Sequence, residues 1–332
     1  MYKYLKSIYW KMQLRKSYFM EAYNFLKLTL KYNASMNTEK DIQKMQYTLS
    51  RETHTIEKGM SMRNPRKGFG QQKVINLIYR LMMYVKKYGI EDPAFLDYPL
   101  STIQTYIEYT NNNGVLIPNI QEEFNKLIKL SGKTHVSNKA GIEVLTKETV
   151  LSQCNLNFES LLFSRHSIRY FSQEYVKDDV IKKALLLAQR TPSACNRQGW
   201  LTHIFRAPQS VDLIKWQGGS HGFEDEIRCA ILVTANLKAF LSYEVHQAYI
   251  DGGLYAMNLI NALHSLGLGT IPLSCGFKYD KLSQLSDFNI PKNEVPIVII
   301  GVGHLDETFK VAISERKPIE KTTVWHMISK DA

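Results

Sequence analysis

The sequence predicts an α+β fold in its second half and a basic, mainly helical region before it. Two patterns after about residue 155 support the α+β part. Short β-rich runs fall at 201–205, 229–235 and 295–302, and their apolar continuity is typical of buried strands. Apolar residues at helical spacing fill 178–190 and 243–266. A third pattern, helical periodicity with polar breaks over 36–150, predicts the helical part.

Composition favours an ordinary globular protein with anionic partners. The 332 residues carry 42 Lys and Arg against 31 Asp and Glu, a formal net charge of +11. The cysteines, Cys154, Cys195, Cys229 and Cys275, are widely spaced. They predict neither a disulfide scaffold nor a metal site, and they favour a reducing, cytoplasmic setting. No apolar run approaches the roughly 18 residues needed to span a bilayer.

The first 31 residues hold a large part of the charge excess. Seven basic residues lie there against the single acidic Glu21: Lys3, Lys6, Lys11, Arg15, Lys16, Lys27 and Lys31. Apolar residues recur at helical spacing from Leu5 to Leu30, and tyrosines and Trp10 interleave with the charges. This composition is typical of helices that lie in a membrane interface. Residues 1–31 therefore predict either peripheral contact with the inner face of the membrane or a helix packed on its own protein with a solvated basic face.

The rest of the first half is interpreted as helices with polar breaks. Apolar spacing predicts helices over 73–88 and 119–130, separated by a strand-poor stretch at 89–118. Five basic residues crowd the loop before Gly68: Arg51, Lys58, Arg63, Arg66 and Lys67. They form either a partner site or, more simply, a solvated face. The predicted domains are a helical basic region at 1–155 and an α+β domain at 156–332.

Three segments of the second half carry the chemistry. Arg165 and Arg169, with Ser167 between them, can converge on one phosphate. The stretch 191–200 offers amide and hydroxyl groups suited to the edge of a flat heterocycle, and 267–276 is interpreted as a loop whose backbone N–H groups face a ring nitrogen.

The sequence also supports predictions for two glycines, one cysteine and one histidine. Gly252 and Gly253 lie mid-helix, where each costs about 1 kcal/mol relative to Ala. They predict the close approach of another backbone or a flat ligand. Cys195 is expected to be a packed small hydrophobe, and His264 a hydrogen-bonded structural residue.

In order and spacing these segments resemble the nitroreductase family of FMN-dependent oxidoreductases. The resemblance covers 156–328. It rests on S-R-H-S-I-R-Y-F at 164–171, P-S-A-C-N-R-Q-G-W at 192–200, Y-I-D-G-G at 249–253, H-S-L-G-L-G-T at 264–270, and V-I-I-G-V-G at 298–303 followed by Arg316. It implies an α/β/α sandwich with a mainly antiparallel central sheet, in an intertwined homodimer with FMN at the interface. The C-terminal 322–328 is then a tail that wraps onto the other protomer.

The resemblance also implies the site residues. Arg165, Ser167, Arg169 and Arg316 hold the phosphate and ribityl chain, and the 192–196 loop comes from the partner subunit to cradle the isoalloxazine. A backbone N–H of 274–276 contacts flavin N5. The full predicted set is Arg165, His166, Ser167, Arg169, Pro192, Ser193, Ala194, Asn196, Gln198, Ser274, Cys275, Gly276 and Arg316. The sequence departs from the family pattern at Gly199, Ser314 and 274–276, and Ser220 is only a weak candidate for a contact with the pyrimidine ring.

The implied function is reduction of a small nitro, quinone or enone acceptor by NADH or NADPH, with ping-pong hydride transfer through FMN. Flavin N5 carries the chemistry, so no catalytic side chain is required. Alternatives are dehalogenation or azoline oxidation on the same fold, or a flavin-fold binding protein docked to membrane or an acidic polymer. Nucleic-acid binding is not expected. The glycine pairs at 267–269 and 301–303 lack the third glycine of a dinucleotide fingerprint.

Overall fold

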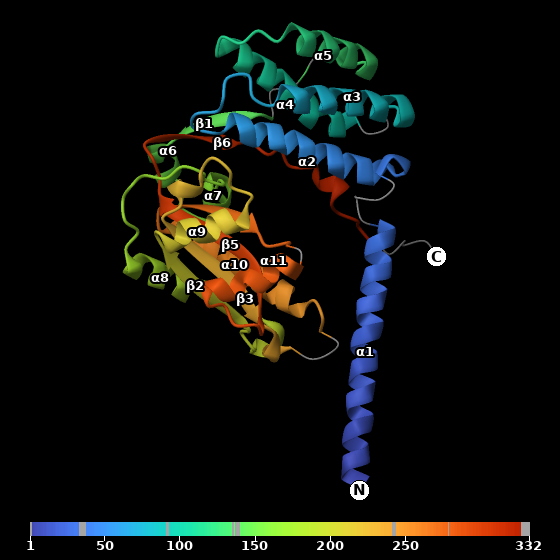
Figure 1. The fold of residues 1–332 in the computed structure, drawn as a ribbon. Coiled ribbons are helices and arrows are strands. Elements are labelled where there is room, and N and C mark those ends of the chain that lie inside the picture. Colours follow the sequence, from blue (N-terminus) through green and yellow to red (C-terminus); the bar gives the residue numbers. More distant parts are fainter. Residues whose placement is uncertain are drawn as a thin grey trace, which may run out of the picture. The chain divides into compact units, whose positions relative to one another are not determined.

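The computed structural model describes residues 2–32, 38–90, 93–134, 136, 140–240, 244–277 and 279–326 (Figure 1). Contacts divide the chain into two compact units. The sheet unit comprises Met1–Lys31 and Val144–Phe309, and the helical unit comprises Tyr32–Glu143 and Lys310–Ala332. This division differs from the predicted boundary at residue 155, because the residues after Phe309 pack with the helical segment.

The helical unit is built from four long helices. They are α2 (Ile42–Met60), α3 (Gln71–Tyr88), α4 (Pro93–Asn112) and α5 (Pro118–Ser131). The helices predicted at 73–88 and 119–130 are confirmed as α3 and α5, while α4 occupies most of the stretch in which no element was assigned. Asp41 begins α2 by accepting a hydrogen bond from the Lys44 backbone N–H at 3.0 Å. Gly132, in the left-handed region, ends α5.

Phe69 anchors the basic loop between α2 and α3 to the core of the helical unit. Its ring packs edge-on against Tyr106 with centroids 5.6 Å apart, and its carbonyl accepts a hydrogen bond from the Tyr106 hydroxyl. A Cβ at Gly59 would lie 2.3 Å from the Phe69 ring, so only glycine leaves room for it. Of the five basic residues predicted to crowd this loop, Arg51 and Lys58 lie on α2 instead, and the loop that carries the other three is fixed at its C-terminal end.

An antiparallel four-stranded sheet forms the centre of the sheet unit. Its order is β2 (Trp200–Arg206), β3 (Cys229–Asn236), β5 (Glu294–His304) and β4 (Leu268–Ser274). The three predicted strands are confirmed, and the predicted α+β class with them. The expectation of a loop at 267–276 was wrong for its larger part, because β4 pairs with β5 from Leu268 opposite His304 to Ser274 opposite Val298.

Helices cover this sheet. On one face α8 (Asp178–Ala188) and α10 (Gln247–Ser265) pack together, and their buried side chains share a core with Ile231 of β3 and Ile300 of β5. Helix α9 (Gln209–Gln217) packs on β2 and β3. Figure 1 shows these helices and the strands of the sheet unit.

The two glycines of α10 have different surroundings. A Cβ at Gly252 would lie 2.6 Å from the Ile297 side chain of β5, whereas a Cβ at Gly253 would meet no atom within 4 Å. The predicted close approach therefore exists at Gly252, but its partner is a strand side chain rather than a backbone. Gly253 leaves an open notch on the exposed side of α10.

The remaining elements are short, apart from α1. β1 (Ile142–Thr146) pairs with β6 (Thr308–Ala312) in a separate two-stranded sheet. The short helices are α6 (Lys147–Leu151), α7 (Phe158–Ser164) and α11 (Tyr279–Ser283), with 3-10 turns at Thr38–Lys40, Ala194–Asn196, Glu224–Glu226, Leu237–Ala239, Gln284–Phe288 and Ile319–Lys321. In the predicted C-terminal tail, Val324 and Trp325 are exposed, and residues 327 and 328 lie outside the described residues.

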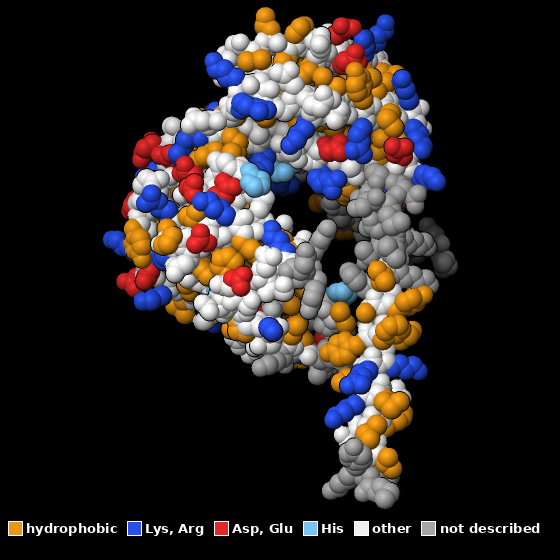
Figure 2. All heavy atoms as spheres, viewed as in Figure 1, with side chains coloured by type: hydrophobic (Ala, Val, Ile, Leu, Met, Phe, Trp, Pro, Cys, Tyr) orange, Lys and Arg blue, Asp and Glu red, His pale blue; other side chains and the backbone are white. Residues whose placement is uncertain are grey.

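Helix α1 (Tyr2–Tyr32) confirms the predicted N-terminal helix. Its side chains from Leu5 to Met20 are exposed, apart from the half-buried Ser17. Figure 2 shows hydrophobic and basic side chains together on its surface. Lys3, Lys27 and Lys31 lie outside the side chains described, and the choice between the two predicted roles of this helix stays a prediction. Within the described residues, no helix combines the length and apolar character needed to cross a membrane.

Candidate functional site

The segment with the two arginines runs in extended backbone along β4. Ser167 forms a parallel bridge with Thr270, and the Ile168 N–H donates to the Thr270 carbonyl at 2.8 Å. Residues two apart in an extended chain share a side, which groups Arg165, Ser167 and Arg169. Arg169 is buried, whereas Arg165, His166 and Ser167 are half-buried. The bridge at Ser167 holds this segment beside β4.

Glycines of two quoted motifs hold this segment in place. A Cβ at Gly303 would lie 2.6 Å from the Phe171 ring, and a Cβ at Gly269 would lie 2.8 Å from Leu305 and 3.1 Å from Ile168. Ile168 and Phe171 are buried. Their packing against backbone that carries no side chain sets the distance between the arginine segment and the sheet.

Thr270 is the residue of β4 nearest to this segment, and its hydroxyl group has unused hydrogen-bonding capacity. It is 1% exposed, and its hydroxyl has no hydrogen-bond partner among the described residues. A buried hydroxyl without a partner costs free energy. The Thr270 hydroxyl, on the residue that bridges to Ser167, therefore has unused hydrogen-bonding capacity.

The 193–198 loop is held in a strained conformation. Cys195, Asn196 and Gln198 all have positive φ, of 51°, 55° and 49°. Non-glycine residues adopt this region at a cost of about 1 kcal/mol or more each, so the surroundings must impose it. Strain of this kind gathers where side chains are presented to a ligand.

A buried carboxylate supplies one of the constraints on this loop. Asp251 of α10 is 1% exposed and accepts the Ala194 N–H at 3.2 Å and the Gln247 side-chain amide at 2.7 Å. Sequence analysis missed this clamp, although an Asp among the apolar residues of a buried helix stripe is a usable signal. A second constraint lies within the loop, where the Gln198 N–H donates to the Ser193 hydroxyl at 2.9 Å.

Arg197 supplies a further constraint. It forms a bidentate pair with Glu244, with both distances 2.7 Å, and donates through Nε to the Ala194 carbonyl at 2.9 Å. Hydrogen bonding to Glu244 raises the pKa of Arg197. The loop consequently leaves Pro192, Asn196 and Gln198 exposed. Cys195 is exposed too, so the expectation that it is a packed hydrophobe was wrong.

At the end of β4, Gln217 joins two loops. Its amide NH₂ donates to the Ser274 carbonyl at 3.0 Å, and its amide oxygen accepts the Gly219 N–H at 2.6 Å. A Cβ at Gly276 would meet no atom within 4 Å, so the backbone there borders open space. Burial raises the pKa of the Cys275 thiol to about 12, which keeps it protonated.

Two further candidates have structural roles. Ser220 is fully buried, and its hydroxyl donates to the Ile214 carbonyl at 3.3 Å, so it caps α9 rather than facing a ligand. The His264 ring lies 2.9 Å from the Ser164 hydroxyl. Burial, together with the charge of Arg165, lowers the pKa of His264 to about 4, so its ring is neutral at pH 7. The predicted structural role of His264 is confirmed.

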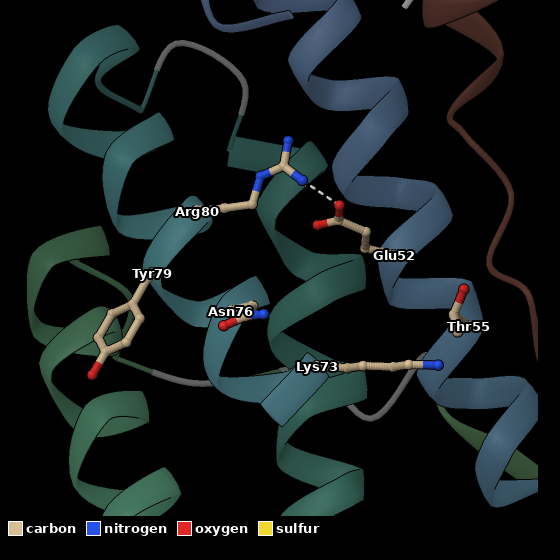
Figure 3. Close-up of a pocket in the computed structure, with 6 residues that line it drawn as sticks. All are labelled: Glu52, Thr55, Lys73, Asn76, Tyr79 and Arg80. Atoms are coloured by element: carbon tan, nitrogen blue, oxygen red, sulfur yellow. Dashed lines mark hydrogen bonds and ion pairs between the residues drawn. The ribbon is translucent and has the colours of Figure 1, made fainter. Parts of the chain in front are cut away.

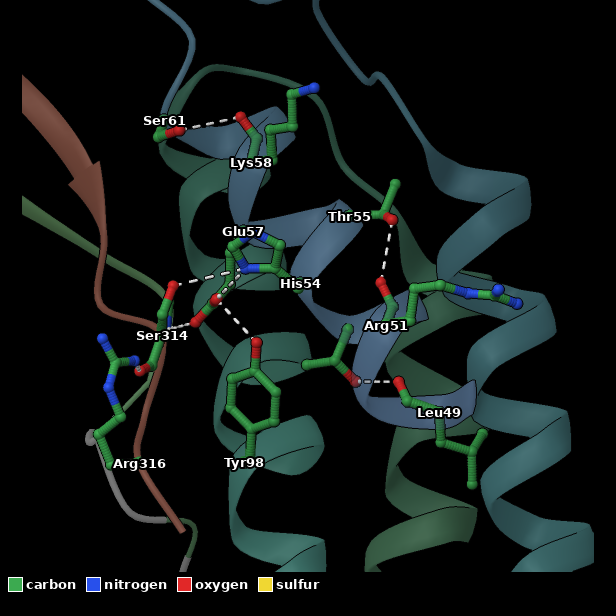
Figure 4. Close-up of polar contacts among 12 residues, drawn as sticks. Leu49, Arg51, His54, Thr55, Glu57, Lys58, Ser61, Tyr98, Ser314 and Arg316 are labelled. Carbon is green, nitrogen blue, oxygen red and sulfur yellow. Dashed lines mark hydrogen bonds and ion pairs between the residues drawn. The ribbon is translucent and has the colours of Figure 1, made fainter. Parts of the chain in front are cut away.

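Arg316, the last predicted phosphate ligand, belongs to the helical unit (Figure 4). Its guanidinium donates to the Ser314 carbonyl. The Ser314 hydroxyl in turn lies 3.4 Å from Nδ1 of His54 on α2, and the Ile313 N–H donates to the Gly141 carbonyl at 3.2 Å. Within its own unit Arg316 therefore sits on an anchored segment, and its contact with phosphate stays a prediction.

Glu57 of α2 is the buried centre of these contacts. It is fully buried, and it accepts the Gly141 N–H at 2.9 Å and the Tyr98 hydroxyl at 2.8 Å. Burial and the Glu57 carboxylate raise the pKa of Tyr98. The Glu57 carboxylate also lies 3.2 Å from His54, but at the same Nδ1 that contacts Ser314. A catalytic triad uses both ring nitrogens, so this cluster is structural.

Comparison with known proteins matches part of the chain to a family. The family model described as Nitroreductase family matches residues 162–304. These residues form a nitroreductase-family domain. They include the arginine segment, the strained loop and β4.

The relatives cover about half of the chain. A protein from Archaeoglobus fulgidus with the provisional name NADH dehydrogenase/NAD(P)H nitroreductase is 26% identical over 149 residues, 43% of this chain and 83% of the relative. NADH dehydrogenase of Thermus thermophilus is 20% identical over 203 residues, 51% of this chain and 96% of that enzyme. A protein from Exiguobacterium sibiricum solved in complex with FMN is 17% identical with a TM-score of 0.45, covering 52% of this chain and 98% of that one.

Proposed function

We propose that this nitroreductase-family protein is an FMN-dependent oxidoreductase in which NADH or NADPH reduces a small organic acceptor of the nitro, quinone or enone type. The observation that carries the proposal is the arginine segment, which sets Arg165, Ser167 and Arg169 on one side of an extended strand beside β4. Family membership of residues 162–304 supports it.

The residues present fit a flavin mononucleotide. Guanidinium and hydroxyl donors on one side of a strand suit a phosphate group. The partnerless Thr270 hydroxyl beside them suits a polar group of the ribityl chain. The open space at Gly276 leaves the backbone of 274–276 accessible to a flat ring.

Bound FMN supplies hydride transfer, so the chain needs only to bind, orient and tune it. Arg165 and Arg169 neutralise the phosphate, and Ser167 donates a hydrogen bond to it. The 193–198 loop, clamped by Asp251 and Arg197, presents Asn196 and Gln198 to the ring edge. The backbone N–H groups of 274–276, steadied through Gln217, would donate hydrogen bonds to the ring.

Anaerobic titration of the purified protein tests this function. We expect a yellow protein whose visible absorption is bleached by NADH or NADPH and restored by an added quinone or nitro compound. A protein that is colourless and takes up no added FMN would contradict the proposal. A bound flavin that neither nucleotide bleaches would favour the flavin-fold binding protein, and turnover only with halogenated or azoline compounds would favour the alternative chemistries.

A homodimer is part of the proposal, because the 192–196 loop is expected to serve the partner's flavin. Helix α10 supports it with an exposed apolar stripe of Tyr249, Ile250, Leu254 and Met257, which are 50%, 52%, 49% and 42% exposed. The open notch at Gly253 lies on the same side of the helix. Exposed apolar stripes of this kind mark contact surfaces.

We propose a second role for α1 as a peripheral anchor on an anionic membrane, which would place a cytoplasmic enzyme at the inner face. Exposed aromatic side chains such as Trp10 and Phe19, 63% and 68% exposed, accompany exposed Lys11, Arg15 and Lys16. Apolar side chains enter the headgroup region while cations pair with acidic lipid.

Vesicle sedimentation tests this anchor. We expect the full chain to bind phosphatidylglycerol vesicles, and the chain without residues 1–31 to lose that binding while it keeps its flavin content. Phosphatidylcholine vesicles are the lipid control. Equal binding by both chains would refute the role of α1, whatever the outcome of the flavin titration.

A further inference from the structure

A cavity in the helical unit lies between α2 and α3 (Figure 3). Its volume is about 540 Å³. It is lined by Glu52 and Thr55 of α2 and by Lys73, Asn76, Tyr79 and Arg80 of α3. This α2–α3 cavity uses none of the residues proposed to bind flavin.

Three side chains of α3 define the polar wall of the cavity. Lys73, Asn76 and Arg80 follow one another at spacings of three and four residues, so they share one side of the helix. In Figure 3 they extend toward α2, while Tyr79 points away from it. Arg80 forms an ion pair with Glu52, which occupies one end of the cavity.

The other end of the cavity offers hydrogen-bond donors. The Lys73 ammonium has no hydrogen bond or ion pair among the described residues. The Asn76 amide oxygen accepts from the Gln72 side chain at 2.9 Å, which leaves its NH₂ group to donate. The Thr55 hydroxyl donates to the Arg51 carbonyl at 3.0 Å and keeps only acceptor capacity. Lys73 and Asn76 therefore present a cation and a neutral donor about one turn apart.

The charge around the cavity also favours an anion. Between residues 42 and 88 the sequence has ten basic residues and only two acidic ones: Lys44, Arg51, Lys58, Arg63, Arg66, Lys67, Lys73, Arg80, Lys86 and Lys87 against Glu52 and Glu57. Both carboxylates are already engaged, Glu52 by Arg80 and Glu57 by Tyr98 and Gly141. This part of the chain therefore carries an excess of positive charge.

We propose that the α2–α3 cavity binds a small organic anion. Lys73 and Asn76 hold its phosphate or carboxylate group, and its uncharged body extends toward the Glu52–Arg80 pair. The volume lies within the range of small-molecule sites, about 300–1,000 Å³, and exceeds what an inorganic ion needs. The Glu52 carboxylate and the Arg80 guanidinium at the far end neutralise each other, so the cavity offers no second unpaired cation to a continuous acidic polymer.

Calorimetric titration of the full-length protein, saturated with FMN, tests this site. The probes are glucose 6-phosphate and citrate as organic anions, glucose as the neutral analogue and inorganic phosphate as the bare ion. We expect one saturable site for an organic anion and none for glucose. Lys73→Met should weaken it about tenfold, the usual effect of losing a charge-assisted hydrogen bond. Lys86→Met removes the same charge elsewhere on α3 and should leave binding unchanged.

Asn76→Asp provides a second variant of nearly the same size. It places a carboxylate beside Lys73 and should abolish binding, while Asn125→Asp on the exposed side of α5 should not. Three results would overturn the proposal. The first is equal weakening by Lys73→Met and Lys86→Met. The others are tighter binding of heparin than of either organic anion, and no saturable heat with any probe. The readout is the heat of probe binding, so the result is independent of whether the flavin turns over.

Discussion

Replacing Arg165 and Arg169 together by alanine is expected to give a folded but colourless protein. Each arginine removed takes away a charge-assisted contact worth about 1.5–3 kcal/mol. Together they should weaken FMN binding by roughly 3–5 kcal/mol, on the order of a thousandfold. The flavin-to-protein absorbance ratio of the purified variant, and the dissociation constant from quenching of flavin fluorescence, measure the effect.

Matched variants separate this effect from a general loss of charge or fold. Arg190→Ala with Arg228→Ala removes two exposed arginines from the same unit and should leave the flavin content unchanged. Arg165→Lys with Arg169→Lys keeps the charge but loses bidentate geometry. The FMN affinity of this variant should therefore fall between those of the unaltered protein and the double alanine variant. Full flavin occupancy in the double alanine variant would rule out the phosphate assignment.

Leu254→Arg is expected to convert a dimer into monomers and to strip the flavin with it. The change places a cation in the exposed apolar stripe of α10, where burial against a second copy would leave it unpaired. The two effects should appear together, because the 192–196 loop is proposed to complete the partner's cofactor site. Light scattering after gel filtration gives the mass, and absorbance gives the flavin content.

Leu186→Arg is the control for this change. Leu186 of α8 is 65% exposed, so an arginine there alters the same residue type without touching the α10 stripe. It should leave both mass and flavin content unchanged. A Leu254→Arg protein that stays dimeric would show that α10 is not in the dimer interface. A flavin-bound monomer would show that the partner's loop is not needed for flavin binding.

Local patterns in the sequence were sufficient for most of the fold. Burial of a segment leaves a pattern in its own sequence, whichever segment it packs against. The apolar runs at β2, β3 and β5, and the helical spacing of α3, α5 and α10, are patterns of this kind. The local pattern of segment 268–274 did not predict the strand that it forms. Its glycine, proline and serine content is typical of a loop, and only the long pairing with β5 makes it a strand.

The candidate site was predictable in part for a related reason. The spacing of Arg165, Ser167 and Arg169 predicted that they could converge on one phosphate, but it did not predict the bridge of Ser167 to β4. The positive φ angles of Cys195 and Asn196 were not predictable, because Asp251 and Glu244 impose them from positions about fifty residues away. The location of Arg316 likewise depends on contacts with α2 that no local pattern encodes.

The contact between the Phe171 ring and Gly303 limits which residues position 303 can hold. One additional methyl group at position 303 would collide with the ring and lever the two arginines away from β4. The position of the two arginines thus depends on the lack of a side chain at a residue far along the chain. Substitutions that silence the enzyme should therefore arise at that remote glycine as readily as at the arginines.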